Sequence, residues 1–98
     1  DRDVTGVQTC ALPICEIPEG IEAQAVQAIE NLKVVAEAAG TELKRTVKTT
    51  CYLTDMSDFP QFNAIYAMYF TEKPARSCVA VKALPKDVLV EIEAIIEL

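Results

Sequence analysis

The stretch PARSCVAVKALPKDVLVEIEAI, residues 74–95, decides the fold because it contains two segments with the alternating pattern of β-strands, separated by a turn at ALPKD. The first segment, residues 75–82, places two sets of side chains on opposite faces: Arg76, Cys78, Ala80 and Lys82 on one, and Ser77, Val79 and Val81 on the other. The second segment, residues 88–96, has one wholly apolar face made of Val88, Val90, Ile92, Ala94 and Ile96. Such a face needs an apolar cover, so the stretch predicts a sheet with helices packed against one side.

Two helices and one further strand are predicted before this stretch. Residues 22–39 have the spacing of an amphipathic helix, and Gly40 stands where a left-handed residue commonly ends one. The apolar face of this helix is expected to contain Val26, Ile29, Leu32, Val35 or Ala36, and Ala39. Residues 47–53, VKTTCYL, alternate as a strand. A second helix is expected to begin at Ser57 or Asp58, either of which can cap it, with Pro60 tolerated in the first turn.

The second helix carries most of the aromatic residues of the chain. Its stripe consists of Phe59, Phe62, Tyr66, Tyr69 and Phe70. Aromatic side chains at helical spacing are typical of a core, and we interpret them as core rather than as a platform on which nucleic-acid bases stack.

The resulting order α-β-α-β-β predicts an α+β fold in which both helices lie on one face of an antiparallel sheet. We expect the opposite face to carry Arg76, Cys78, Glu91 and Glu93, together with the apolar Leu89 and Ile95. A mixed face of this kind suits a surface that another subunit covers, with an arginine and a glutamate in the resulting crevice. The arginine offers a planar fork for a carboxylate or phosphate, and a glutamate can orient or deprotonate a water. An ordinary cross-strand ion pair is the alternative interpretation of the same two residue types.

Composition narrows the functional classes. Nine Lys and Arg stand against fifteen Asp and Glu, a net charge of −6, so nothing favours a protein that holds a nucleic-acid backbone by charge. There is no histidine and no CxxC spacing, which disfavours zinc sites and histidine-activated nucleophiles. No apolar run approaches the roughly 20 residues needed to span a bilayer, and the cysteine pattern suits a reducing cytoplasm.

The first fourteen residues, Asp1 to Ile14, differ abruptly in character from the acidic, alanine-rich segment that follows. Back-translation of Val4 to Ile14 matches the constant part of a common DNA-sequencing adapter. We expect residues 1–14 to be adapter-derived and Cys15 to come from a hybrid codon, so that the domain proper is residues 15–98. The alternative is a natural N-terminal hairpin.

Residues 74–95 resemble the signature of the RidA/YjgF family of enamine/imine deaminases, also described as the L-PSP endoribonuclease family. The run Pro74-Ala75-Arg76, the turn Leu84-Pro85 and the triplet at residues 90–92 have the family's spacing. The segments EIPEG, AQAVQAIENLKVVAEAAG and VKTTCYLTDMSDFPQFNAIYAMYF resemble the same family in the same order. The resemblance therefore covers nearly all of residues 16–98.

The resemblance implies a chorismate-mutase-like subunit, a homotrimer, and ligand clefts between subunits. It implies that Arg76 binds the carboxylate of a 2-imino or 2-enamino acid, that Glu91 positions the attacking water, and that Cys78 lines the pocket. Asn63 is expected to support the site. The implied products are a 2-oxo acid and ammonia, without nucleic acid, membrane, metal or cofactor. A non-catalytic, carboxylate-binding regulatory trimer is the alternative, and an endoribonuclease or translation inhibitor is less favoured.

Family members begin with three further strands, which this chain is expected to lack. Their absence leaves an unpaired sheet edge, and such an edge recruits any β-prone segment. We therefore also expect residues 4–12 to be drawn onto that edge as a strand.

Overall fold

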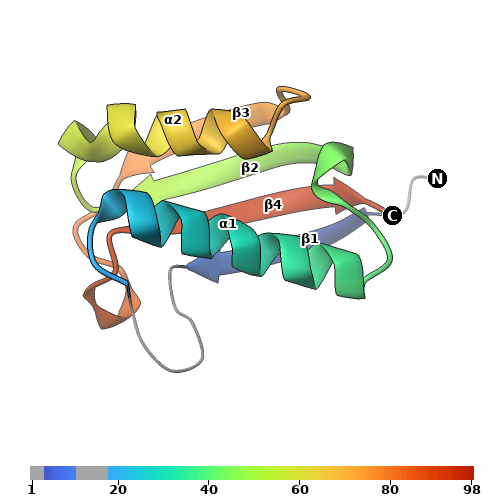
Figure 1. Cartoon of the computed structure of the whole chain (residues 1–98), viewed down its shortest axis with the longest axis horizontal. Helices are drawn as coiled ribbons and strands as arrows, with labels where there is room; N and C mark the ends of the chain where they lie inside the picture. The colour runs from blue at the N-terminus through green and yellow to red at the C-terminus, as the bar shows by residue number, and fades with distance from the viewer. Residues whose placement is uncertain (1–3, 11–17) are drawn as a thin grey trace.

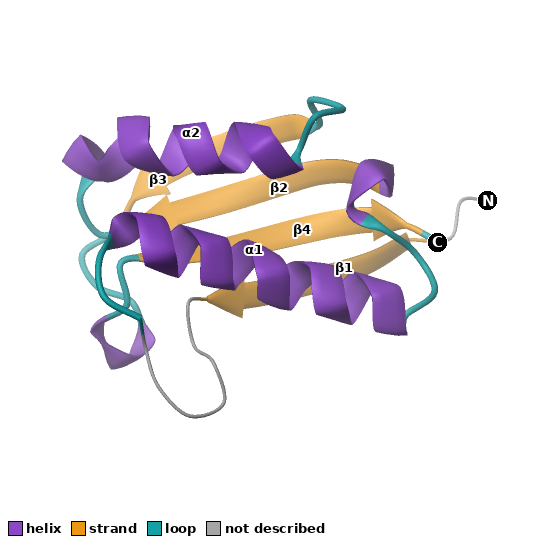
Figure 2. Cartoon of the chain, viewed as in Figure 1, coloured by secondary structure: helices purple, strands orange, loops and turns teal. Residues whose placement is uncertain are grey.

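The computed structural model describes residues 4–10 and 18–98. Two helices cover one face of a four-stranded sheet whose strand order is β1-β4-β2-β3 (Figures 1 and 2). The elements are β1 (Val4–Cys10), α1 (Ile21–Ala38), β2 (Thr46–Leu53), α2 (Phe59–Tyr69), β3 (Ala75–Ala80) and β4 (Val90–Glu97). This arrangement confirms the expected α+β class, with both helices on one face.

The sheet is mixed, so the expectation of an antiparallel sheet is wrong in part. Strand β4 pairs antiparallel with both β1 and β2, but β2 and β3 run parallel. The parallel pair arises because α2 connects β2 to β3 and returns the chain to the starting end of the sheet, as a crossover helix does. Figure 1 shows α2 in front of β3 and β2, and α1 in front of β4 and β1.

The core lies between the helices and the sheet. The apolar face predicted for residues 88–96 is confirmed, since Val88, Val90, Ile92 and Ile96 are completely buried and Ala94 nearly so. On α1, Ile29, Leu32 and Ala36 are buried, whereas Val35 is 45 % exposed, which decides between the two alternatives at that position. From α2, Phe62, Tyr66 and Phe70 enter the same core, as the aromatic stripe predicts.

Two predicted helix boundaries are confirmed, and Asp58, one of the two predicted capping residues, occupies the N-cap position of α2. Gly40 follows α1 in the left-handed region, with φ 85°, and Pro60 lies in the first turn of α2. Neither Ser57 nor Asp58 caps α2 with its side chain. Instead, the side chain of Asp55 accepts a hydrogen bond of 2.9 Å from the backbone N–H of Ser57, in a 3₁₀ turn that leads into the helix. The side-chain hydrogen bond thus caps the 3₁₀ turn that precedes α2, while Asp58 at the N-cap of α2 makes none.

The expected extra edge strand is confirmed for Val4–Cys10, which pairs with β4 along its length. Leu12, the expected end of that strand, lies outside the described residues, as does the expected domain boundary between Ile14 and Cys15. None of the described helices is both long enough and apolar enough to cross a membrane.

Candidate functional site

Arg76 lies on the face of β3 that α2 covers. It is paired across the parallel ladder with Thr49, a buried residue of β2. Residues paired in this way share a face of the sheet, and Thr49 belongs to the face packed against the helices. The expectation that Arg76 and Cys78 point away from the helices is therefore wrong. Alternation placed Val79 and Arg76 on opposite faces correctly, but in the structure Val79 is on the uncovered side, 44 % exposed.

Three side chains of α2 hold the Arg76 guanidinium. Its Nη1 donates a hydrogen bond of 2.6 Å to Oδ1 of Asn63. Its central carbon lies 4.6 Å from the centre of the Tyr66 ring and 5.4 Å from that of Phe59. The face of an aromatic ring attracts a cation at such distances. No carboxylate among the described residues forms an ion pair with Arg76, so the charge is held by neutral groups.

The ring of Tyr66 is fixed on its other sides. Its hydroxyl shares a buried hydrogen bond of 2.7 Å with Oγ1 of Thr49. Its ring stacks on Phe70 with the centroids 4.5 Å apart, and Phe62 contacts it at 5.8 Å. Burial raises the pKa of the Tyr66 hydroxyl, so it stays protonated near neutral pH. Tyr66 is thus a core residue and, at the same time, a wall of the site.

An open groove of about 350 Å³ lies beside Arg76. Asn63, Tyr66, Phe70 and the charged residues Lys73 and Arg76 contribute to its lining, and none of the described lining residues is acidic. Lys73 adopts a left-handed backbone conformation, with φ 54°, in the short connection between α2 and β3. Two cations and an amide around an open groove favour an anionic ligand with hydrogen-bond acceptors, such as a carboxylate.

Cys78 shares the face of Arg76 and is paired across the ladder with the buried Cys51. Both thiols are free. Burial raises the pKa of Cys51 to about 12, and burial also raises that of Cys78, an effect that the nearby Arg76 opposes. Neither thiol is therefore poised as a thiolate nucleophile. Cys78 is not among the residues that line the groove beside Arg76, so its expected place in the pocket stays a prediction. Among the described residues, no cluster of three or more metal-binding side chains occurs.

Glu91 lies on the other face of the sheet. It is paired with Tyr52 of β2, which is in turn paired with the exposed Val79 of β3. One chain therefore brings Arg76, Asn63 and Cys78 together but separates them from Glu91 by the thickness of the sheet. Of the apolar residues expected on this uncovered face, Ile95 is 41 % exposed. Leu89 precedes β4 and is partly buried, packed against the core.

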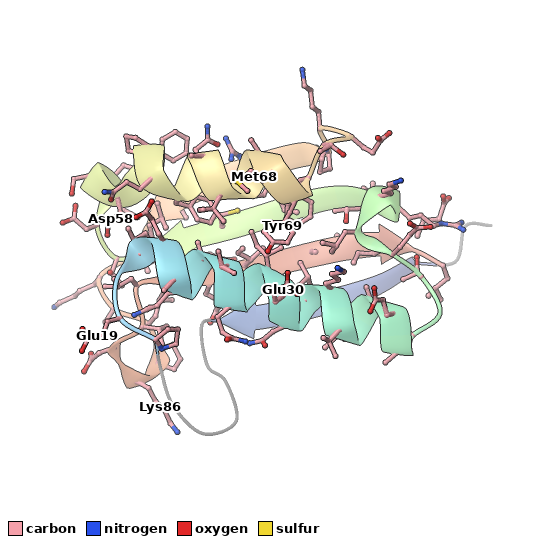
Figure 3. The ribbon with its side chains drawn as sticks, viewed as in Figure 1. Glu19, Glu30, Asp58, Met68, Tyr69 and Lys86 are labelled. Atoms are coloured by element: carbon pink, nitrogen blue, oxygen red, sulfur yellow. The ribbon has the colours of Figure 1, made fainter. Side chains whose placement is uncertain are left out.

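A second groove, of about 230 Å³, lies between the two helices and includes Lys33, Lys44, Met68 and Tyr69. The hydroxyl of Tyr69 donates a hydrogen bond of 2.7 Å to Glu30, and Figure 3 shows this pair between α1 and α2. None of the predicted site residues lines this groove, and its charges are mixed because Glu37 and Glu42 also contribute. The groove beside Arg76 is the better candidate.

A model of the family described as Endoribonuclease L-PSP matches residues 10–98. The chain belongs to the RidA/YjgF family. A protein of Escherichia coli K12 named 2-iminobutanoate/2-iminopropanoate deaminase is 50 % identical to it over 84 residues, which are 82 % of this chain and 66 % of that protein. The chain thus spans just under two thirds of the length of this relative.

Solved structures of RidA/YjgF proteins share the fold. The YjgF gene product of Escherichia coli superposes with a TM-score of 0.88 at 42 % identity, covering 96 % of this chain and 78 % of that one. A crystal structure of Escherichia coli TdcF with bound serine gives a TM-score of 0.91 at 36 % identity, covering 97 % of this chain and 80 % of that one.

Sequence reasoning missed Tyr66 and Phe59 as parts of the site, because their spacing on the helix is fully explained by burial. It also missed Lys73. The sequence shows that Lys73 precedes Pro74 in a break between a helix and a strand, but it does not show the left-handed backbone conformation of Lys73.

Proposed function

We propose that the full-length protein hydrolyses reactive 2-imino and 2-enamino acids, such as 2-iminobutanoate and 2-iminopropanoate, to 2-oxo acids and ammonia. The observation that carries this proposal is the Arg76 guanidinium, which faces an open groove without a carboxylate partner among the described residues. The name of the Escherichia coli relative supports the same substrate class. The serine bound to TdcF, itself an α-amino acid, agrees with recognition of an α-carboxylate.

Arg76 binds the substrate carboxylate in this proposal. The guanidinium is planar and has five N–H donors. One of them, on Nη1, donates to Asn63. The remaining donors suit the two oxygens of a carboxylate, and the cation offsets its charge in a partly buried place. Cys78 lines the site beside the bound carboxylate without forming a bond to the substrate.

Glu91 activates water, and we propose that it does so from a neighbouring subunit. Since Arg76 and Glu91 of one chain lie on opposite faces of the sheet, they meet at one substrate only if the uncovered face of one subunit approaches the groove of the next. Water then adds to the imine carbon while Glu91 accepts a proton from that water and passes it to the imine nitrogen. The resulting carbinolamine transfers its hydroxyl proton to the nitrogen as the C–N bond breaks, which releases ammonia and the 2-oxo acid. The proposed homotrimer is the assembly that would supply this contact.

The test is release of ammonia and 2-oxo acid by the full-length protein from an imine generated in situ by an amino-acid oxidase. Arg76→Lys keeps the charge and removes the fork, so KM should rise and kcat/KM should fall about 10-fold or more. Glu91→Gln keeps the shape and removes the base, so kcat should fall about 10²-fold. Full activity in Glu91→Gln would remove the water-activating role.

A regulatory, non-catalytic carboxylate-binding trimer is the alternative that this experiment separates, because a binder needs Arg76 but not Glu91. An endoribonuclease, the activity in the family's name, is disfavoured by the net charge of −6. The described lining of the groove also supplies only two cations, Lys73 and Arg76, which is few for holding a nucleic-acid backbone. The free thiols Cys51 and Cys78 suit a reducing compartment, and we propose a cytoplasmic location.

A further inference from the structure

Arg76 is long and flexible, yet a carboxylate-binding arginine works best when its fork is held in one orientation before the ligand arrives. Asn63 fixes only one edge of the guanidinium, through the Nη1 bond of 2.6 Å. A single hydrogen bond leaves the guanidinium free to rotate about the axis of that bond. A second restraint on the plane of the guanidinium is therefore required to set where the free N–H groups point.

Tyr66 supplies that restraint. The central carbon of the guanidinium lies over its ring at 4.6 Å, closer than over the ring of Phe59 at 5.4 Å. Two contacts restrain the Tyr66 ring: its hydroxyl shares a hydrogen bond of 2.7 Å with Thr49, and Phe70 stacks on it with the centroids 4.5 Å apart. Thr49 belongs to a central strand and is also the ladder partner of Arg76.

These contacts form a closed loop of restraints. Thr49 fixes Tyr66, Tyr66 orients the guanidinium of Arg76, and the backbone of Arg76 is paired with Thr49. We propose that Tyr66 is the positioning residue for the carboxylate clamp: its ring, anchored by Thr49, sets the plane in which Arg76 presents its fork to an α-carboxylate. This inference rests on the proposed function for the identity of the ligand, but the orientation of Arg76 can be measured without any turnover.

The direct readout is the Nε–Hε resonance of Arg76 in a ¹⁵N-correlated NMR spectrum. The chain has three arginines, Arg2, Arg45 and Arg76, so the signal is assigned by its loss in Arg76→Lys. A proton held over an aromatic face is shielded, and we expect Arg76 Hε to lie upfield of the other two. Tyr66→Phe keeps the ring but removes its hydrogen bond to Thr49, so part of the shift should be lost. Tyr66→Leu should return the signal to the position of a free arginine.

The functional readout is the affinity for 2-oxobutanoate, the carboxylate probe, together with KM and kcat for imine hydrolysis. Tyr66→Leu should weaken probe binding and raise KM about 3- to 10-fold, the range of a partly desolvated cation–π contact, while kcat changes less than twofold. Tyr69→Leu is the matched control, because it removes a tyrosine from the same helix whose hydroxyl bonds to Glu30 and not to the site. The control should leave both the Arg76 signal and the probe affinity unchanged.

An unshifted Arg76 signal in Tyr66→Leu, or a fall confined to kcat, would overturn the inference. If Tyr66→Leu does not fold, Thr49→Val and Tyr66→Phe decide the matter, since they remove the same hydrogen bond from its two ends. Equal, non-additive losses of the Arg76 shift in these two variants and their double variant support the loop of restraints. Additive losses or none would contradict it. If the protein releases no ammonia from imines but the NMR shift behaves as expected, the proposed reaction fails while the positioning role of Tyr66 stands.

Discussion

Cys78 lies two residues beyond Arg76 on the same face of β3, where a thiol could be mistaken for a nucleophile. Its pKa is raised by burial, and imine hydrolysis needs no covalent intermediate. We expect Cys78→Ala in the full-length protein to retain most of its deaminase activity, with kcat/KM within about threefold of the wild type. Loss of activity with the assembly intact would instead indicate thiol chemistry.

Cys51 provides a prediction about stability and pH. The ordinary pKa of a cysteine thiol is 9.0, and burial raises the pKa of Cys51 in the folded protein to about 12. A group whose pKa is raised on folding contributes its full stabilisation below the unfolded value, and this contribution is lost as the pH rises toward the folded value. We therefore expect the free energy of unfolding to fall between about pH 9 and pH 12, by about 2 kcal/mol at pH 10.5 from Cys51 alone.

Urea denaturation at pH 8 and at pH 10.5 measures this loss. Cys51→Val replaces the buried thiol with a side chain of similar volume. In this variant the drop in the free energy of unfolding from pH 8 to pH 10.5 should shrink by the contribution of Cys51. A drop of the same sign should remain, because the pKa values of Cys78 and Tyr66 are also raised. An identical pH dependence in the wild type and Cys51→Val would show that the Cys51 thiol does not titrate differently on folding.

At the scale of elements, the C-terminal end of α1 depends on Gly40, whose φ of 85° is unfavourable for residues with a side chain. No atom lies within 4 Å of the position a Cβ would occupy there, so the cost of a substitution is conformational and not steric. We expect Gly40→Ala to lower the free energy of unfolding by about 1 kcal/mol and Gly40→Asn by less, because asparagine tolerates the left-handed region better. Thermal denaturation of the two variants side by side tests the order, and equal stability of Gly40→Ala and the wild type would contradict it.

Alternation in the sequence predicted which residues of each strand share a face, and the structure confirms this for β3 and β4. Alternation does not say which face the helices cover. For β4 the choice was clear, because Val90, Ile92 and Ile96 form a wholly apolar side. For β3 the apolar Val79 suggested the wrong side, since an edge strand can turn apolar residues outward when another surface covers them.

The same limit applies to the site. Arg76, Cys78 and Asn63 could be named from the resemblance, and the structure brings them together. Their separation from Glu91 could not be predicted, because alternation does not say which face of β3 the helices cover, and the register that pairs Arg76 with Thr49 settles it only in the structure. The role of Tyr66 was hidden for another reason: burial alone accounts for its position, and only the 4.6 Å distance to Arg76 reveals a second role.

At the scale of the whole molecule, the uncovered face of the sheet carries the exposed Val79 and Ile95 beside the polar Glu91. We expect sedimentation of the full-length protein to show a trimer. Ile95→Lys places a charge on this face and should shift the protein toward monomers. Met68→Lys, at a site that is 71 % exposed on the helical side, is the control and should leave the trimer intact. A wild-type monomer, or an Ile95→Lys trimer as stable as the wild type, would contradict this use of the face.

The central claim is that Arg76 of one subunit and Glu91 of another act on the same substrate, and mixing two impaired variants, assayed at a substrate concentration below KM, tests it most directly. Arg76→Lys and Glu91→Gln proteins are unfolded together, refolded in equal amounts and assayed for ammonia release. In a random mixture about one quarter of the sites between subunits regain both native residues, so activity should recover to about one quarter of the wild-type value. If both residues of a site came from one chain, the mixture would be no more active than the two variants assayed separately, and that result would contradict the account.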